Sequence, residues 1–126
     1  TGRKMPLQGN PSKSYLHADD LSAAIELLLR KPKSGVFNVG SPSPVSIHKI
    51  VEEVASQFVK TTNEIAEVTE GRPNEDQCFW LNSEKIMRMG WTPVIDLKSG
   101  LTQMAEWGRR YEKEISEMST DYLMTP

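Results

Sequence analysis

The chain places an imidazole and two carboxylates in one short stretch, His17-Ala18-Asp19-Asp20. Histidine changes its charge close to neutral pH, so a carboxylate beside it is a pattern that proton-transfer sites use. On an extended segment His17 and Asp19 would share one face, but two ligands do not make a metal site. In the first turn of a helix, Asp20 would stabilise the helix without any chemistry. We therefore expect Asp20 to cap a helix and His17 to be structural. No metal site is predicted.

A second candidate is Arg72, which lies in a stretch whose composition predicts a turn, Gly71-Arg72-Pro73-Asn74. A guanidinium group presents a planar fork of donors that fits phosphate and carboxylate oxygens. The residues alone leave two interpretations open. Arg72 either binds an anionic ligand or is a surface arginine that pairs with Glu70 or Glu75.

Hydrophobic periodicity predicts the elements that carry these residues. Strands are expected over 14–18, 36–39 and 65–68. Helices are expected from 21 to just before Pro32, over 47–58, over 83–89 and from 97 to 111, with an extension as far as Ile115. Ser46, Ser83 and Asp96 are predicted as helix N-caps, and Gly90 as a left-handed terminator. Residues 1–12 have no periodicity and are expected to form either a loop or the cut edge of something larger.

Composition limits the class of protein. The chain has 126 residues, of which 37% are hydrophobic and 25% charged, so it has the size and composition of one globular domain. Its net charge of −2 gives no electrostatic reason to expect binding to nucleic acid or to an anionic membrane. Its single cysteine, Cys78, excludes an intramolecular disulfide and favours a reducing compartment, so we expect a cytoplasmic protein.

Four segments, in one order along the chain, resemble the C-terminal part of the extended short-chain dehydrogenase/reductase family, the NAD(P)-dependent nucleotide-sugar epimerases and dehydratases. The segments are Gly9 with Lys13–Leu21, Phe37–Gly40 with Val45–Ile47, Gly71–Asp76, and Asn82–Lys85 with Met89–Pro93 and Gly100-Leu101. The resemblance implies an α/β fold of helices and short strands, without the family's N-terminal dinucleotide-binding sheet. It implies a substrate-binding fragment over residues 1–118, followed by a frayed tail at 119–126.

The resemblance also assigns substrate contacts. The position of Arg72 favours a clamp on the diphosphate of a nucleotide-sugar. Lys13 stands where the family commonly has an arginine that touches the nucleotide, and lysine keeps the charge without the bidentate geometry. A solvated loop lysine is an alternative for Lys13. Asp76 would orient Arg72 or accept a hydrogen bond from a ribose hydroxyl, with an ordinary loop acid as the alternative.

The family's catalytic and cofactor motifs have no counterpart among these 126 residues. No three glycines have the spacing of a dinucleotide-binding turn, and no tyrosine is followed by a lysine four residues later. The resemblance therefore implies that NAD or NADP binds elsewhere in a parent enzyme. It predicts that this chain is a piece of that enzyme and is inactive by itself.

Partners follow from the same reasoning. The expected ligand is the nucleotide-sugar substrate of the parent. Strands that normally adjoin a sheet would leave edges exposed, so we expect a homodimer or a strand-exchanged oligomer. Two alternatives are a stand-alone α/β binding module without catalysis and a structural subunit with a degenerate enzyme fold.

Overall fold

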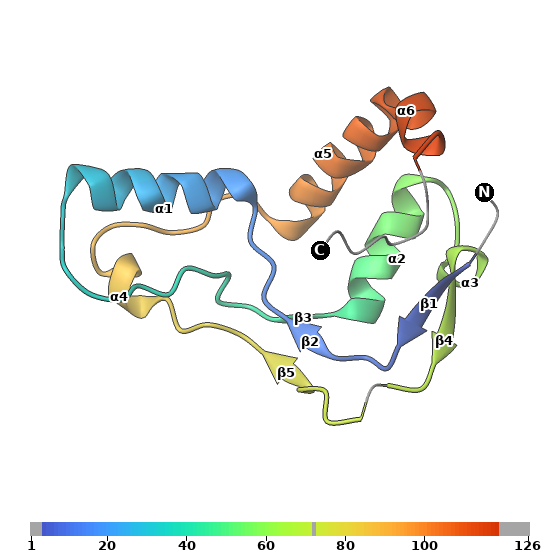
Figure 1. The fold of residues 1–126 in the computed structure, drawn as a ribbon, viewed down its shortest axis with the longest axis horizontal. Coiled ribbons are helices and arrows are strands. Elements are labelled where there is room, and N and C mark those ends of the chain that lie inside the picture. The colour runs from blue at the N-terminus through green and yellow to red at the C-terminus, as the bar shows by residue number, and fades with distance from the viewer. Residues whose placement is uncertain (1–3, 72, 119–126) are drawn as a thin grey trace, which may run out of the picture.

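The computed structural model describes residues 4–71 and 73–118. It is a mixed α/β structure, as the sequence predicts (Figure 1). Its elements in chain order are β1 (Met5–Gln8), β2 (Ser12–Lys13), α1 (Ala18–Arg30), β3 (Val45–Ser46), α2 (Ile47–Gln57), α3 (Thr62–Ile65), β4 (Ala66–Thr69), β5 (Cys78–Phe79), α4 (Glu84–Met87), α5 (Leu97–Arg110) and α6 (Glu112–Ser116). The frayed tail predicted at 119–126 lies outside the described residues.

The strands form two small sheets. β1 and β4 pair in parallel, with Met5 opposite Ala66. In the second sheet the strand order is β3-β2-β5, where β2 runs antiparallel to β3 and parallel to β5. The prediction of a loop over residues 1–12 is therefore wrong for β1 and for Ser12. β1 escaped detection because its only buried residue is Leu7, so it has no periodic apolar pattern.

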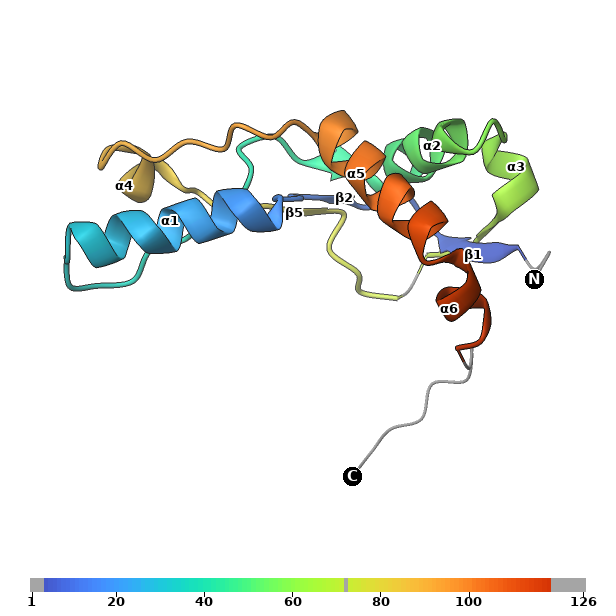
Figure 2. The ribbon, with the colours of Figure 1, turned by 90° about the horizontal axis from the view of Figure 1, so that it is seen from above.

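Two separate hydrophobic clusters hold the chain together. One consists of Leu7, Val51 and Ala66, with Ile47 and Ile65 packed against it. The other consists of Ala24, Ile86 and Trp91, with Leu16, Leu27, Leu28, Phe37 and Val39 around it. Figures 1 and 2 show the corresponding shape: α1 and α4 lie at one end, and β1, β4 and α2 lie at the other. We call these ends the α1 lobe and the α2 lobe. The β3-β2-β5 sheet lies between them, and α5 packs on α2.

Two predicted strands are not formed. The segment over 14–18 was expected to be a strand, but the ladder ends at Lys13 and Ala18 already begins α1. Ser14 still donates its backbone N–H to the Phe79 carbonyl at 3.0 Å, and the chain then turns into the helix. The segment over 36–39 forms no strand, because it pairs with no other strand among the described residues.

Most helix boundaries are where the sequence places them. The Ser46 hydroxyl accepts the Lys49 N–H at 3.3 Å, and the Asp96 carboxylate accepts the Ser99 N–H at 2.9 Å, which confirms both caps. Gly90 has a φ of 104°, as a terminator beyond α4 requires.

Ser83 precedes α4 as predicted, but its hydroxyl does not cap the helix. It bonds both the N–H and the carbonyl of Gly40, at 2.9 and 3.1 Å. Asn82 accepts the Glu84 N–H instead, at 2.9 Å. Ser83 therefore connects α4 to the segment before β3.

Candidate functional site

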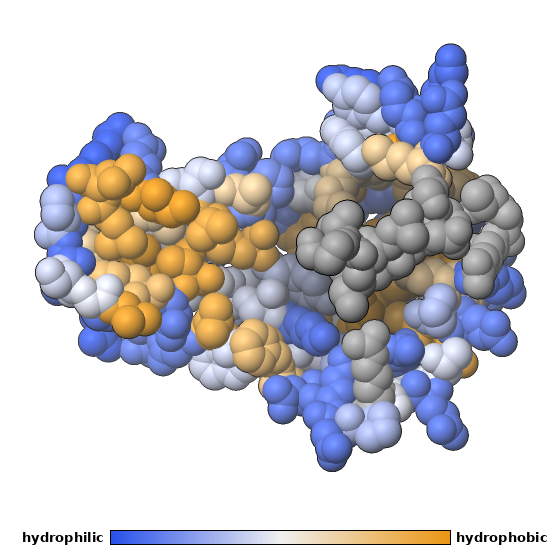
Figure 3. Space-filling model, in the orientation of Figure 1, coloured by the Kyte–Doolittle hydropathy of each residue, from blue (hydrophilic) through white to orange (hydrophobic). Residues whose placement is uncertain are grey.

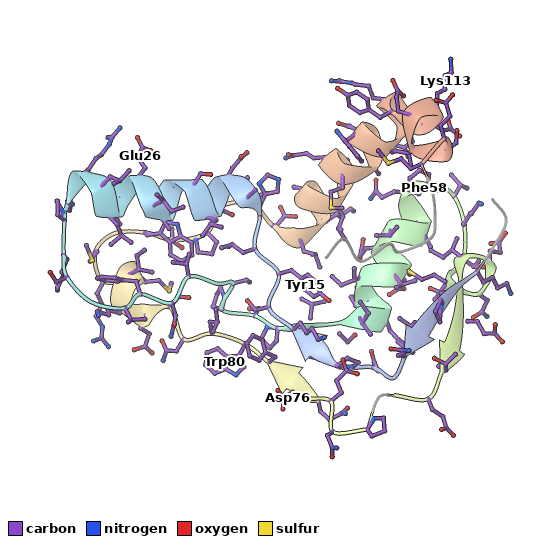
Figure 4. All side chains as sticks on the ribbon, viewed as in Figure 1. Tyr15, Glu26, Phe58, Asp76, Trp80 and Lys113 are labelled. Carbon is purple, nitrogen blue, oxygen red and sulfur yellow. The ribbon has the colours of Figure 1, made fainter. Side chains whose placement is uncertain are left out.

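Lys13 and Asp76, two of the three predicted site residues, line the same hollow. β2 pairs with β5 so that Lys13 lies opposite Phe79, and this register carries the lysine to the loop that precedes β5. A hollow of about 240 Å³ is lined by Lys13, Glu75, Asp76 and Phe79. Figure 4 shows Asp76 in the loop just before β5. The third predicted residue, Arg72, lies outside the described residues.

A second hollow, of about 230 Å³, shares Lys13 and Glu75 with the first. Its other lining residues are mostly apolar and come from β1, from the residues around β2 and from the start of α2: Met5, Pro6, Leu7, Gln8, Pro11, Tyr15 and Ile47. Sequence reasoning missed the side of this hollow that β1 forms, because it predicted a loop over residues 1–12. Only the parallel pairing of β1 with β4 reveals that strand, and this pairing joins residues far apart in the sequence.

Close approach of two glycines fixes the loops beside these hollows. Gly9 has a φ of 57°, and a Cβ placed on it would lie 3.1 Å from the Cα of Gly71. Its N–H donates to the Thr69 carbonyl at 3.1 Å. A side chain at residue 9 would therefore meet both an unfavourable backbone conformation and the opposing main chain. This contact holds the end of β1 against the loop that leads to Arg72.

The charged side chains around the first hollow are negative on balance. Lys13 Nζ lies 3.3 Å from Glu75 Oε1, with 46% of the lysine side chain and 19% of the glutamate side chain exposed. An ion pair this exposed is weak, so an incoming anion can compete for the ammonium group. Asp76 adds a second negative charge. The described residues alone therefore supply one cation and two carboxylates, which is a poor balance for a diphosphate.

The stretch from His17 to Asp20 is structural, but the roles differ from those predicted. His17, not Asp20, is the N-cap of α1, and its Nδ1 accepts the Asp19 N–H at 3.2 Å. Asp20 follows in the first turn and is 2% exposed. Its two carboxylate oxygens accept the N–H groups of Val94 and Ile95, at 2.9 and 3.1 Å. The carboxylate thus joins α1 to the segment before α5, a long-range partner that no local pattern reveals.

A larger and mostly apolar hollow, of about 450 Å³, lies among the residues that connect the two lobes. Its lining includes Tyr15, His17, Ser43, Pro93 and Met104. Figure 4 shows Tyr15 between β2 and α2. Neither Lys13 nor Asp76 lines this hollow, so it is separate from the first hollow. Within residues 4–71 and 73–118 no three His, Cys, Asp or Glu side chains gather in a way that could hold a metal ion. None of the helices in that part of the chain is long and apolar enough to cross a membrane.

Known proteins that resemble this chain act on nucleotide-linked sugars. The dTDP-D-glucose 4,6-dehydratase of Bos taurus is 31% identical over 108 residues, which cover 80% of this chain and 30% of the relative. A trifunctional UDP-glucose 4,6-dehydratase/UDP-4-keto-6-deoxy-D-glucose 3,5-epimerase/UDP-4-keto-L-rhamnose-reductase of Arabidopsis thaliana is 28% identical over 110 residues, 85% of this chain and 16% of the relative. No protein-family model matches the chain.

A solved structure agrees with these relatives. The crystal structure of dTDP-glucose 4,6-dehydratase from Bacillus anthracis in complex with NAD superposes with a TM-score of 0.76 and 27% identity, over 89% of this chain and 36% of that one. These homologues and this structure neighbour are dTDP- and UDP-sugar dehydratases and epimerases, the NAD-dependent extended short-chain dehydrogenase/reductase family that the sequence resembles, and the chain aligns with only part of each. It spans less than a third of the length of these two relatives.

Proposed function

We propose that this chain forms part of the nucleotide-sugar pocket of an NAD(P)-dependent dehydratase or epimerase. The observation that supports the proposal most directly is that Lys13 and Asp76, which the family resemblance assigns from two motifs far apart in the sequence, line one hollow. The relatives named above act on dTDP- and UDP-sugars, so a nucleotide diphosphate is the ligand class to test first.

In this proposal each side chain has a distinct role. The Lys13 ammonium group binds a phosphate oxygen as a point charge, and this contact replaces its ion pair with Glu75. Arg72 supplies the planar clamp on the diphosphate and the second positive charge that the hollow requires. Asp76 accepts a hydrogen bond from a ribose hydroxyl. The neighbouring hollow, with apolar walls from β1, suits the flat face of a base.

The cofactor is assigned to another part of such an enzyme. NAD is bound in the Bacillus anthracis relative. A pyrophosphate-binding turn needs closely spaced glycines, and proton transfer in this family needs a tyrosine with a lysine four residues later; this sequence contains neither pattern. We therefore expect no turnover by these 126 residues alone. An NAD-dependent conversion of UDP- or dTDP-sugars by the purified chain would contradict this expectation.

Calorimetric titration with UDP and dTDP tests the pocket. We expect binding by the wild-type chain, loss of binding in Arg72→Ala, and weaker binding in Lys13→Ala. Arg88→Ala is the matched control, because Arg88 is an exposed arginine paired with Glu84 in the α1 lobe and should leave the affinity unchanged. Absence of nucleotide binding in the wild-type chain, or equal losses in the Arg72 and Arg88 variants, would overturn the proposal.

A further inference from the structure

The first hollow depends on a very short pair of strands. One of its walls is β2 and the other is the loop that runs into β5, and each of these strands has two residues. The Ser12 N–H donates to the Gln77 carbonyl at 2.8 Å, and the Ser14 N–H donates to the Phe79 carbonyl at 3.0 Å. Strands this short are marginally stable without further contacts. The geometry of the hollow therefore needs support from outside the strand pair.

Two serine hydroxyls supply such support from the segment before β3. Ser14 directly follows β2, and its hydroxyl donates to the Ser41 carbonyl at 2.8 Å. Ser83 directly precedes α4, and its hydroxyl accepts the Gly40 N–H at 2.9 Å and donates to the Gly40 carbonyl at 3.1 Å. The dipeptide Gly40-Ser41 is thus held from β2 on one side and from α4 on the other. We call these four residues the serine junction.

The serine junction is buried and leaves little free space. Ser83 is 4% exposed and Gly40 is buried, so water cannot replace the Ser83 hydroxyl. A Cβ placed on Gly40 would lie 3.2 Å from Ser14 Oγ and 3.3 Å from Leu81 Cβ. Leu81 comes two residues after β5, so the junction touches the chain beyond both strands that carry the hollow. A shift at the junction would therefore move β2 relative to β5.

The junction also connects the hollow to the α1 lobe. Figure 3 shows apolar surface over the α1 lobe, which contains α4, and hydrophilic surface over the loop that precedes β5. Ser83 belongs to the first region and the hollow to the second. A polar ligand site at the surface is in this way fixed to an apolar core through one hydroxyl.

We propose that Ser14 and Ser83 are positioning residues for ligand binding in the first hollow. Neither side chain lines the hollow. Both act through the serine junction, which keeps β2 beside β5 and so keeps the Lys13 ammonium group facing Glu75 and the loop that carries Asp76. A site held in its binding geometry loses less conformational entropy when a ligand arrives. The inference rests on the proposed function, since it names the residues that hold that site.

Calorimetric titration with UDP tests the positioning role. We expect Ser14→Ala and Ser83→Ala to bind UDP at least about threefold more weakly than the wild type. Gly40→Ala should do the same, because its Cβ pushes the junction apart without removing a hydroxyl. Ser14→Thr keeps the hydroxyl and should keep the wild-type affinity. Ser22→Ala is the matched control, since the Ser22 hydroxyl also donates to a backbone carbonyl but lies exposed on α1. Unchanged affinity in both alanine variants of the junction, or equal weakening in Ser22→Ala, would overturn the proposal.

Hydrogen–deuterium exchange of the ligand-free chain separates this inference from the proposed function. Ser14→Ala and Ser83→Ala should speed exchange over residues 12–14 and 77–79. Ile86→Ala is the stability control, because it damages the core of the α1 lobe and should leave exchange in these segments and the UDP affinity unchanged. Absence of UDP binding in the wild-type chain would refute the proposed function, and exchange would still show whether the junction holds the two strands. Unchanged exchange in both serine variants would refute the positioning role.

Discussion

Asp20 connects two segments that are far apart in the sequence. Its carboxylate accepts the N–H groups of Val94 and Ile95, and its own carbonyl accepts the indole N–H of Trp91 at 2.9 Å. Because the residue is 2% exposed, water cannot replace either bond to the carboxylate. A single side chain therefore fixes how α1 packs against the segment that leads into α5.

Asp20→Asn should destabilise the chain by about 1–3 kcal/mol. The amide keeps one acceptor oxygen but turns an NH₂ group toward the second backbone N–H, which leaves a buried donor without a partner. Urea unfolding followed by circular dichroism measures the loss. Asp19→Asn is the control, because this exposed neighbour should cost about 0.5 kcal/mol or less. Equal losses in the two variants would show that the buried bonds contribute little.

The Glu75 carboxylate repels the anion that the first hollow is proposed to bind. It neutralises Lys13 and adds to the negative charge of Asp76. Glu75→Gln should therefore tighten UDP binding, by about three- to tenfold, since it removes a competing charge at a partly exposed site. Glu106→Gln, which removes an exposed charge from α5, should leave the affinity unchanged. Weaker binding in Glu75→Gln would instead make Glu75 a ligand contact.

The sequence predicted Lys13 and Asp76 as site residues and offered Glu75 only as a possible partner of Arg72, not of Lys13. Residue type and family position pointed to the cation and the acid. The partner of Lys13 depends on the pairing of β2 with β5, and strands of two residues leave no periodic pattern to detect. For Asp20 the local helix-cap pattern misled, because the hydrogen bonds that decide its role come from residues 94 and 95.

At the scale of elements, the N-cap of α5 is Asp96, whose carboxylate accepts two hydrogen bonds from Ser99. The pKa of Asp96 is lowered from its ordinary value of 3.8, first because its carboxylate accepts the backbone N–H of Ser99, and then because it accepts the Ser99 hydroxyl. A carboxylate with a lowered pKa in the folded state stabilises the fold at pH values above its unfolded pKa. This contribution disappears as the pH falls through the lower, folded pKa.

Asp96→Ala should lower the melting temperature by a few degrees near neutral pH, and this difference from the wild type should shrink below about pH 4. Asp96→Asn should nearly preserve the melting temperature, because asparagine is also a good N-cap, but it should remove this share of the pH dependence. Melting curves over a series of pH values compare the three proteins. A difference between Asp96→Ala and the wild type that persists in acid would exclude an ionised cap.

The helices were predicted better than the strands for a physical reason. The pattern within α2 and α5 repeats over three turns, and Ser46 and Asp96 satisfy the first backbone donors locally, so each helix carries its own signal. A strand is completed by a neighbour. The segment over 36–39 has a suitable composition, yet it finds no adjacent strand in the described chain, whereas β1 lacks the pattern and does find β4.

The whole molecule has two small cores rather than one. Ile86 is fully buried in the α1 lobe, and Val51 is 3% exposed in the α2 lobe. Since the two clusters share no residue, damage to one should open that lobe before the other. Local and global stability are then different quantities in this protein.

Ile86→Ala should cost about 2–5 kcal/mol and speed amide hydrogen exchange mainly in α1 and α4. Val51→Ala should instead speed exchange mainly in β1, β4 and α2. Hydrogen–deuterium exchange followed by mass spectrometry resolves the two patterns, and each variant is the control for the other. Uniform acceleration over the chain in both variants would show a single cooperative unit.

Both cores join residues from opposite halves of the chain, and this has a consequence during synthesis. β1 is synthesised before its partner β4, and α1 before Ile86 and Trp91. The first core cannot close until Ala66 has emerged from the ribosome, and the second cannot close until Ile86 and Trp91 have emerged, so each core forms well after its first residues are made. In the interval the nascent α1 exposes the apolar residues that later pack on Ile86 and Trp91. A holdase chaperone that recognises short leucine-rich segments would therefore find its binding site in residues 21–29 of the growing chain.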